Sequence, residues 1–289
     1  MSKQSIGLLA LFTAAFLYGS QTIATKIAGV SVAPFLSTSI RALVVVLLVV
    51  WFVPWKRVAK VHFRWFIARS SANILSTTGL FFAITKIPVG IALFSFYAGM
   101  ILATTLVGSI WYNERMSRIK FISLFLTIIG LLCMYLTNSG LVFNVYIFIA
   151  AFGGVCAGLW SIFSRPLSGF YPLTQLVVLD NALAAVFAMG VSLILHESWK
   201  GMYLGIPVLS LSYLGLTQAF TGQLVAHGFR YIDGQVGSII LLNDTIIGIV
   251  LMMLFFKEFP SMQVFIGGVC IFLASILPAI FEHKKGNKS

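Results

Sequence analysis

The sequence predicts an all-α polytopic membrane protein with ten transmembrane helices in two inverted five-helix repeats. Its 289 residues are 60% hydrophobic and only 9% charged. The mean hydropathy of +1.02 lies far above that of soluble domains. Apolar runs of about 20 residues, long enough to cross a hydrocarbon core of about 30 Å, follow one another along the chain. One charged hairpin also recurs 144 residues downstream.

The recurring unit is a pair of apolar runs joined by a short polar turn. The turn of the first copy carries Glu114, and the turn of the second carries Glu258, 144 residues later. The same separation relates Gly90 to Gly234. Because many transporters are built from two such copies, an internal repeat of this size indicates a transport function.

The order of the apolar runs divides the chain into halves of five helices, 1–139 and 140–289. Because five is odd, the second half enters the membrane from the opposite face, which makes the repeats inverted. The first apolar run is interpreted as a helix and not as a secretory signal, because its removal would break this arrangement. The expected spans are 6–25, 34–53, 65–84, 89–111, 119–137, 145–164, 173–195, 204–226, 234–256 and 263–281.

The basic residues predict the orientation. The side that holds both termini carries 13 of the 19 Lys and Arg residues, and the opposite side carries four. Because Lys and Arg gather in cytoplasmic loops, both termini are expected in the cytoplasm, with the protein in a plasma membrane such as the bacterial inner membrane. This bias accounts for the net charge of +12 without a nucleic-acid partner. Cys133, Cys156 and Cys270 lack metal-ligand spacing, so no metal or other cofactor is expected.

Several short motifs occur in a fixed order. They are Tyr18-Gly19 in the first span, Lys26 at its end, Pro34 and Arg41 in the second span, and Glu114-Arg115 after the fourth. In this order the chain resembles the drug/metabolite transporter superfamily, specifically its EamA-type members, over nearly its whole length. The resemblance implies two five-helix repeats and transport of amino acids, nucleoside-like metabolites, vitamins or drugs.

Two features depart from that family. Its usual Pro in the fourth and ninth helices is absent, so any bend there is expected to come from Gly99 or from Asn243 and Asp244, whose side chains compete for backbone hydrogen bonds. Glu258 lacks a basic residue after it. We expect Glu258 to cap its turn, and the alternative is a gating role.

Besides Asp244, three charged residues deep inside the expected spans need a partner or a purpose. Arg41 and Asp180 occupy near-matching positions of the two repeats, so we expect their helices to meet and the two side chains to pair, directly or through water or substrate. This pair could be structural or could contact substrate. Arg69 lies five residues from Arg64 and is expected to extend its side chain to the cytoplasmic surface.

Asp244 is the strongest candidate for a functional residue. It lies near the middle of the ninth span beside Asn243, at the depth where substrate sites of inverted-repeat transporters are found. We expect Asp244 to bind a proton or the positive group of a substrate, with Asn243 as a hydrogen-bond partner. The alternative is a protonated, packed side chain.

Four further residues are expected to line the central cavity. Gln21 could hydrogen-bond a substrate, and Tyr18, Tyr97 and Trp160 could stack on a planar ligand or hold a cation. Core packing is the alternative reading of the aromatic residues, and a helix-to-helix hydrogen bond is that of Gln21.

These observations favour a secondary active transporter that moves a small metabolite, an amino acid or a related zwitterionic or nucleoside-like compound, by alternating access with proton or exchange coupling. Its expected partners are the substrate, membrane lipids and protons. An intramembrane enzyme is disfavoured because the four His are scattered and no two carboxylates lie one helical turn apart. A channel is disfavoured because rings of like charge and a filter sequence are absent.

Overall fold

The computed structural model describes residues 3–111, 118–137, 140–141, 144–199, 205–228, 231, 240–241 and 243–286. These residues contain ten α-helices. They are α1 (Lys3–Gly29), α2 (Pro34–Val49), α3 (Lys60–Lys86), α4 (Val89–Trp111), α5 (Arg118–Tyr135), α6 (Val145–Ser168), α7 (Leu173–Ile194), α8 (Ile206–Gly228), α10 (Asn243–Phe256) and α11 (Met262–Gly286). A 3-10 helix, η1 (Val50–Phe52), extends α2, and β1 (Leu136–Thr137) pairs antiparallel with β2 (Gly140–Leu141) between α5 and α6.

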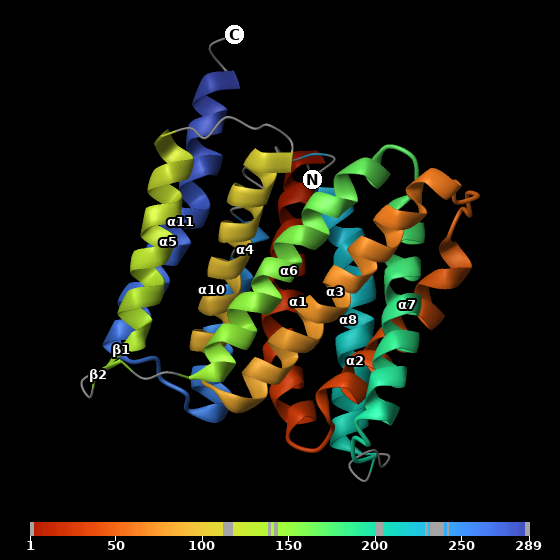
Figure 1. The fold of residues 1–289 in the computed structure, drawn as a ribbon, viewed down its shortest axis with the longest axis horizontal. Helices are drawn as coiled ribbons and strands as arrows, with labels where there is room; N and C mark the ends of the chain where they lie inside the picture. The colour runs from red at the N-terminus through yellow and green to blue at the C-terminus, as the bar shows by residue number, and fades with distance from the viewer. Residues whose placement is uncertain are drawn as a thin grey trace.

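The helices run alternately up and down in a bundle, and α1 begins at the same end at which α11 finishes (Figure 1). We call this the N-terminal end. The connection after α1 lies at the opposite end, together with those between α3 and α4, α7 and α8, and α10 and α11 (Figure 1). We call that the Lys26 end. A chain that crosses the membrane an even number of times is expected to have both termini on the same side.

The helix contacts are symmetric between the two halves. Helix α1 packs on α8 and α10, and its counterpart α6 packs on α3 and α4. The remaining central contacts pair α2 with α7 and α5 with α11. Exchanging the first five helices for the second five therefore reproduces the same set of neighbours, which is consistent with two five-helix repeats.

Glycines allow the backbones to approach closely at the symmetric crossings. A Cβ atom on Gly154 of α6 would overlap the carbonyl oxygen of Phe96 on α4, and one on Gly99 of α4 would overlap that of Ala151. At the related crossing of α1 and α10, a Cβ on Gly19 would lie 2.8 Å from the carbonyl oxygen of Asp244. Both crossings therefore depend on small residues, as in other membrane helix pairs.

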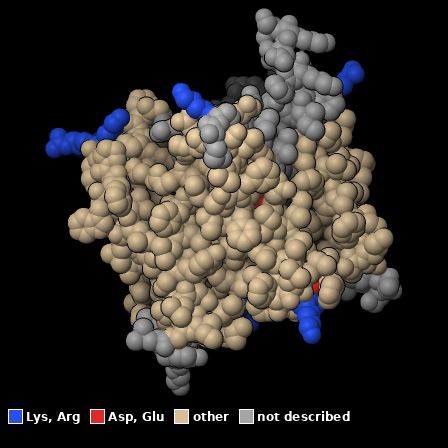
Figure 2. Space-filling model, turned by 180° about the vertical axis from the view of Figure 1, so that it is seen from behind, with Lys and Arg blue, Asp and Glu red and all other residues tan. Residues whose placement is uncertain are grey.

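The surface identifies the bundle as a multi-pass membrane protein. Among the described helices, α1, α2 with η1, α4, α6 and α7 are long and apolar enough to cross a membrane, and three shorter apolar segments lie in α5, α10 and α11. Leu254, Phe255 and Phe265 are among many large apolar side chains on the outside. Figure 2 shows Lys and Arg at the two ends of the visible face, with a wide, mostly uncharged band between them.

The expected spans agree with the observed helices, with three qualifications. The two short strands between α5 and α6 were not expected. Most of the first part of the expected span 234–256 lies outside the described residues, and α10 is described from Asn243. The turn that carries Glu114 and Arg115 also lies outside the described residues.

Candidate functional site

Asp244 and Tyr97 meet in the interior, where α10 lies beside α4. The Tyr97 hydroxyl donates hydrogen bonds to both carboxylate oxygens of Asp244, at 3.0 Å to Oδ1 and 2.8 Å to Oδ2. The Thr245 hydroxyl donates a third, at 3.0 Å to Oδ1. Asp244 and Tyr97 are both partly accessible, whereas Thr245 is buried. A carboxylate from the second half of the chain is therefore held by a hydroxyl from the first.

Helix α1 completes this cluster. At Gly19 the backbone of α1 approaches that of Asp244 closely. The preceding residue, Tyr18, lies close enough to the Asp244 carboxylate to interact with its charge. The hydroxyl groups of Tyr97 and Tyr18 are also close enough to interact electrostatically. The predicted residues Tyr18, Tyr97 and Asp244 thus come together at the meeting point of α1, α4 and α10.

Asp244 forms no ion pair within the described part of the chain. The two ion pairs found there are Lys26 with Glu258 and Arg69 with Asp180. The neighbouring Asn243 donates from Nδ2 to the carbonyl oxygen of Ile240 at 2.9 Å. The described hydrogen-bond donors to the Asp244 carboxylate are all neutral: the hydroxyls of Tyr97 and Thr245 and the backbone N–H of Thr245.

Asp180 lies in a second buried cluster, and its partner differs from the one predicted from sequence. The predicted pair of Arg41 and Asp180 is wrong, because Asp180 pairs with Arg69 at 2.5 Å. Ser70 donates to Asp180 Oδ1 at 2.8 Å and the indole of Trp160 donates to Oδ2 at 3.0 Å. Asp180 is 2% exposed, and these groups of α3 and α6 are its partners.

Arg69 is likewise buried and partnered, so the prediction that it reaches the membrane surface is also wrong. It is 1% exposed. Its Nε donates to Ser164 at 2.7 Å, and its Nη1 donates to the carbonyl oxygen of Leu176 at 3.2 Å. The guanidinium lies over the Trp160 ring, 4.9 Å from its centroid. Trp160 therefore does hold a cation, but the cation belongs to the protein.

Arg41 and Gln21 have different surroundings. The Nε atom of Arg41 is buried and has no hydrogen-bond partner among the described residues. Gln21 donates to the Thr217 hydroxyl at 3.1 Å, which joins α1 to α8. The structure therefore places Gln21 in a helix contact and leaves Arg41 without a counter-ion in the described chain.

An ion pair joins the two halves at the Lys26 end. Glu258, in the connection between α10 and α11, lies 2.8 Å from Lys26 at the end of α1, and both side chains are partly exposed. Glu258 also accepts a hydrogen bond from the backbone N–H of Val89, in the first turn of α4, at 3.1 Å. Lys26 donates to the carbonyl oxygen of Ile84 on α3. The Glu258 side chain therefore caps a helix of the other repeat.

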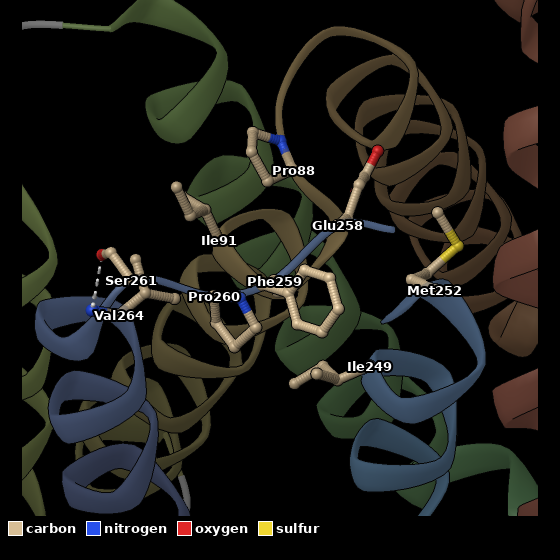
Figure 3. Close-up of a pocket in the computed structure, with 10 residues that line it drawn as sticks. Pro88, Ile91, Ile249, Met252, Glu258, Phe259, Pro260, Ser261 and Val264 are labelled. Carbon is tan, nitrogen blue, oxygen red and sulfur yellow. Dashed lines mark hydrogen bonds between the residues drawn. The ribbon is translucent and has the colours of Figure 1, made fainter. Parts of the chain in front are cut away.

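Beneath this ion pair lies a cavity of about 190 Å³ between α4 and α10. Figure 3 shows Glu258, Pro88 and Ile91 on one side of it and Ile249 and Met252 on the other. Apart from Glu258 and Ser261, the residues that line it are apolar. The cavity therefore places the charged group at the rim of an apolar space.

A second carboxylate acts as a helix cap at the same end. Glu197, just after α7, accepts backbone hydrogen bonds from Phe35 at 3.2 Å and Leu36 at 2.9 Å, in the first turn of α2. Such a position suits a negative charge, because unsatisfied N–H groups gather at a helix N-terminus. The sequence analysis did not identify Glu197, although it is one of only seven acidic residues and each of those needs a partner.

The family comparison decides the class of protein. The sequence profile of the EamA-like transporter family matches residues 5–136 and again 144–279. The chain belongs to the EamA-like transporter family. Its two matched segments are the two halves of the bundle, so this EamA-like protein is a membrane transporter and not an enzyme.

Comparison with other proteins adds information on the fold. None of the curated proteins matches the chain. Among solved structures 26 chains match, and one, described only as "Crystal structure of protein", aligns over 97% of this chain and 98% of its own with a TM-score of 0.61. Its sequence identity is 16%, so this likeness concerns the fold alone.

Proposed function

We propose that this EamA-like protein is a secondary active transporter that moves a small metabolite, an amino acid or a related zwitterionic or nucleoside-like compound, across the plasma membrane. Alternating access of the two repeats, 1–139 and 140–289, provides the movement. Asp244 is the coupling carboxylate. Family membership supports membrane transport, and the geometry around Asp244 supports the coupling role.

The observation that carries this proposal is the set of partners around Asp244. A charged side chain inside a membrane costs about 2.5–3.5 kcal/mol on insertion scales, so its charge must be compensated. At Asp180 the compensation is a paired Arg69. At Asp244 the described partners are the hydroxyls of Tyr97 and Thr245. A proton or the positive group of a substrate can supply the missing positive charge.

Competition for this single carboxylate provides the coupling. When a proton occupies Asp244, a substrate cation is excluded, and when the substrate cation is bound, the proton is released. Each ligand therefore lowers the occupancy of the other, and the linkage is reciprocal. Movement of one across the membrane in one direction then drives movement of the other in the opposite direction.

Alternating access is supported by the two kinds of contact between the repeats. The glycine crossings of α1 with α10 and of α4 with α6 provide smooth surfaces on which helices can move. The ion pair of Lys26 and Glu258 ties α1 to the other repeat at one end of the bundle. Breaking that pair would free this end to open.

The orientation forms part of the proposal, with both termini in the cytoplasm. It is tested by cysteine labelling in a variant that lacks the three native cysteines. Lys3→Cys, at the N-terminal end, is expected to react only with a membrane-permeant maleimide in intact cells. Ser198→Cys, an exposed residue after α7 at the Lys26 end, is expected to react also with an impermeant one. Labelling of both positions from the same side would contradict the inverted arrangement.

The transport proposal is tested by comparing the metabolites of cells that lack the protein with those of cells that overproduce it. A metabolite that changes in opposite directions is then assayed in sealed vesicles with an imposed pH gradient. Asp244→Asn, which keeps the size of the side chain but cannot bind a proton, is expected to fold and to lose gradient-driven transport. Asp244→Glu is the matched control and retains part of the activity. Wild-type pH dependence in Asp244→Asn would overturn the coupling role.

A further inference from the structure

An apolar groove separates α10 from α11. Its volume is about 400 Å³, and apart from Thr245 every residue that lines it is apolar. Phe94 of α4 forms part of the wall, and its ring lies against Gly268 of α11. The two long walls come from α10, with Ile246, Ile249, Val250 and Met253, and from α11, with Phe265, Val269 and Phe272. The groove therefore suits an apolar molecule and not a charged one.

The groove is present because α11 is not packed along α10. In the first repeat α5 packs on the helix before it, α4. In the second repeat α11 packs on α5 and α4, and α10 packs on α1 and α4, but these two consecutive helices are not among the closely packed pairs of the described chain. The apolar side chains that two packed helices would bury against each other therefore remain without a protein partner here.

The groove is long and narrow, and it runs along the helices. Its lining residues on α10 extend from Thr245 to Met253 on one side of the helix, a rise of about 12 Å. Pro260 lines it at the Lys26 end, and Thr245 lies beside Asp244, near the middle of the span. Because the hydrocarbon core is about 30 Å thick, this length is close to the depth of one leaflet.

The rims of the groove are exposed on the outside of the bundle. On α10 the exposed fractions are 46% for Ile246 and 46% for Val250, and on α11 they are 57% for Phe265 and 43% for Val269. The outward faces of membrane helices meet lipid tails, which are as apolar as Leu. The groove therefore opens sideways to the acyl chains of the bilayer.

A lysine lies where the groove reaches the end of the bundle. Lys257 follows Met253 by four residues and precedes Pro260 by three, and both of these line the groove. Three residues of chain span at most about 11 Å, so the Lys257 ammonium group is within reach of the groove. Lys257 is exposed and forms no ion pair within the described part of the chain. Its φ of 55° is a conformation that favours glycine, so a side chain at this position is kept at a cost in backbone strain.

We propose that this groove binds one anionic phospholipid, with an acyl chain between α10 and α11 and the phosphate of the head group at Lys257. The acyl chain covers the apolar walls that neither helix covers. The ammonium group of Lys257 attracts the negative head group at the membrane surface. This inference goes beyond the transport proposal, because lipid binding requires neither a substrate nor a proton gradient.

The test measures lipid binding to the purified full chain in detergent by native mass spectrometry. Phosphatidylglycerol and phosphatidylcholine with identical acyl chains are added separately at increasing concentrations. We expect one phosphatidylglycerol to bind more tightly than any further copies, and phosphatidylcholine to bind about fivefold more weakly, which is the contribution of one lysine near an anionic surface. Equal binding of the two lipids, or the absence of a first tight site, would overturn the proposal.

Variants that fill the groove locate the acyl chain. Val269→Trp on α11 and Val250→Trp on α10 place an indole in the groove from opposite walls, and both are expected to lose the tight site. Val186→Trp is the matched control, because Val186 is a 75% exposed residue of α7 away from the groove. Thermal unfolding without added lipid identifies which variants are folded. A tight site that persists in a folded groove variant would overturn the proposal, as would a dimer of the chain that these variants dissociate, because a second copy would then occupy the groove.

Variants of the lysine locate the head group. Lys257→Gln is expected to bind phosphatidylglycerol about fivefold more weakly than the wild type and to lose the preference over phosphatidylcholine, whereas Lys257→Arg keeps both. Lys86→Gln, which removes an exposed lysine at the same end of the bundle, is the control and should bind as the wild type does. Unchanged preference in Lys257→Gln, or an equal loss in Lys86→Gln, would overturn the assignment of the head group to Lys257.

Discussion

Asp180 and Asp244 are the same residue type in the same half of the chain, and their surroundings differ. Asp180 is enclosed between α3, α6 and α7, where Arg69, Ser70 and Trp160 compensate its charge. Asp244 lies where α1, α4 and α10 meet, partly accessible and hydrogen-bonded to the hydroxyls of Tyr97 and Thr245. The first arrangement supplies the carboxylate with a cationic partner, whereas the second supplies only neutral donors among the described residues.

The two arginines within the membrane-spanning helices differ in the same way. Arg69 has a carboxylate, a hydroxyl, a carbonyl oxygen and an aromatic ring as partners. Arg41 has no ion pair among the described residues, and its buried Nε atom has no hydrogen-bond partner there. The comparison teaches that depth in the membrane alone does not identify a functional charge. The partners around it separate a charge that holds helices together from one that has no counter-ion among the described residues.

The largest expected effect comes from breaking the paired cluster. Arg69→Met leaves Asp180 buried without a counter-ion, so we expect a loss of about 3–5 kcal/mol of stability or failure to accumulate folded protein. Arg41→Met is the matched control, because it removes an arginine of similar depth without breaking an ion pair. Detergent-solubilised yield and thermal unfolding measure both. An equal loss in the two variants would remove the distinction between the clusters.

A smaller loss is expected from separating the helices at a glycine crossing. Gly154→Ala places a methyl group against the carbonyl oxygen of Phe96, so the backbones of α4 and α6 must move apart. We expect a loss of about 1–3 kcal/mol, as for other overpacked contacts. Gly190→Ala on α7 is the control, because nothing lies within 4 Å of the added atom. Thermal unfolding compares the two, and tolerance of Gly154→Ala would show that this crossing is loose.

The ion pair of Lys26 and Glu258 is expected to contribute less, because both side chains are partly exposed. Lys26→Gln should lower stability by about 0.2–1 kcal/mol, whereas Lys86→Gln, which removes an exposed lysine at the same end, should have no effect. Combining Lys26→Gln with Glu258→Gln should cost less than the sum of the single changes. Additive losses in this double-mutant cycle would show that the pair does not tie the repeats together.

The smallest expected effect is a gain in stability at the end of α7. His196 has a positive φ of 50°. The backbone there closes the helix with hydrogen bonds from His196 to Leu193 and from Glu197 to Ser192. Glycine adopts this conformation without strain, so His196→Gly should stabilise the protein by about 0.5–1 kcal/mol. Thermal unfolding measures the change, with exposed Ser198→Gly as a control that should not stabilise. A fall in Tm of His196→Gly would show that the imidazole has a role of its own.

The sequence predicted the helices and the repeat well, because both depend on local apolar runs and on self-similarity of the chain. It also predicted that Tyr18, Tyr97 and Asp244 belong to the interior. It could not predict that the Tyr97 hydroxyl reaches the Asp244 carboxylate, because that contact depends on the crossing of two helices from different halves.

The pairing of Arg69 with Asp180 could have been inferred from depth. Helices α3 and α7 begin at the same end, and by a rise of about 1.5 Å per residue Arg69 lies about 13 Å and Asp180 about 10 Å along them. The repeat symmetry pointed to Arg41 as the partner of Asp180 instead, because the two residues occupy near-equivalent positions in the two repeats. Equivalent positions in inverted repeats lie at mirrored depths, so matching position does not imply contact.

The most direct test of the central claim is whether Asp244 changes its protonation state. Infrared difference spectra of the purified protein in nanodiscs, recorded as the pH is lowered, report the C=O stretch of protonated carboxylic acids. Comparison of the wild type with Asp244→Asn isolates the contribution of this side chain, and Glu258→Gln serves as a control for an unrelated carboxylate. We predict a band that is present in the wild type and in Glu258→Gln and missing from Asp244→Asn. Identical spectra for the wild type and Asp244→Asn would contradict the account.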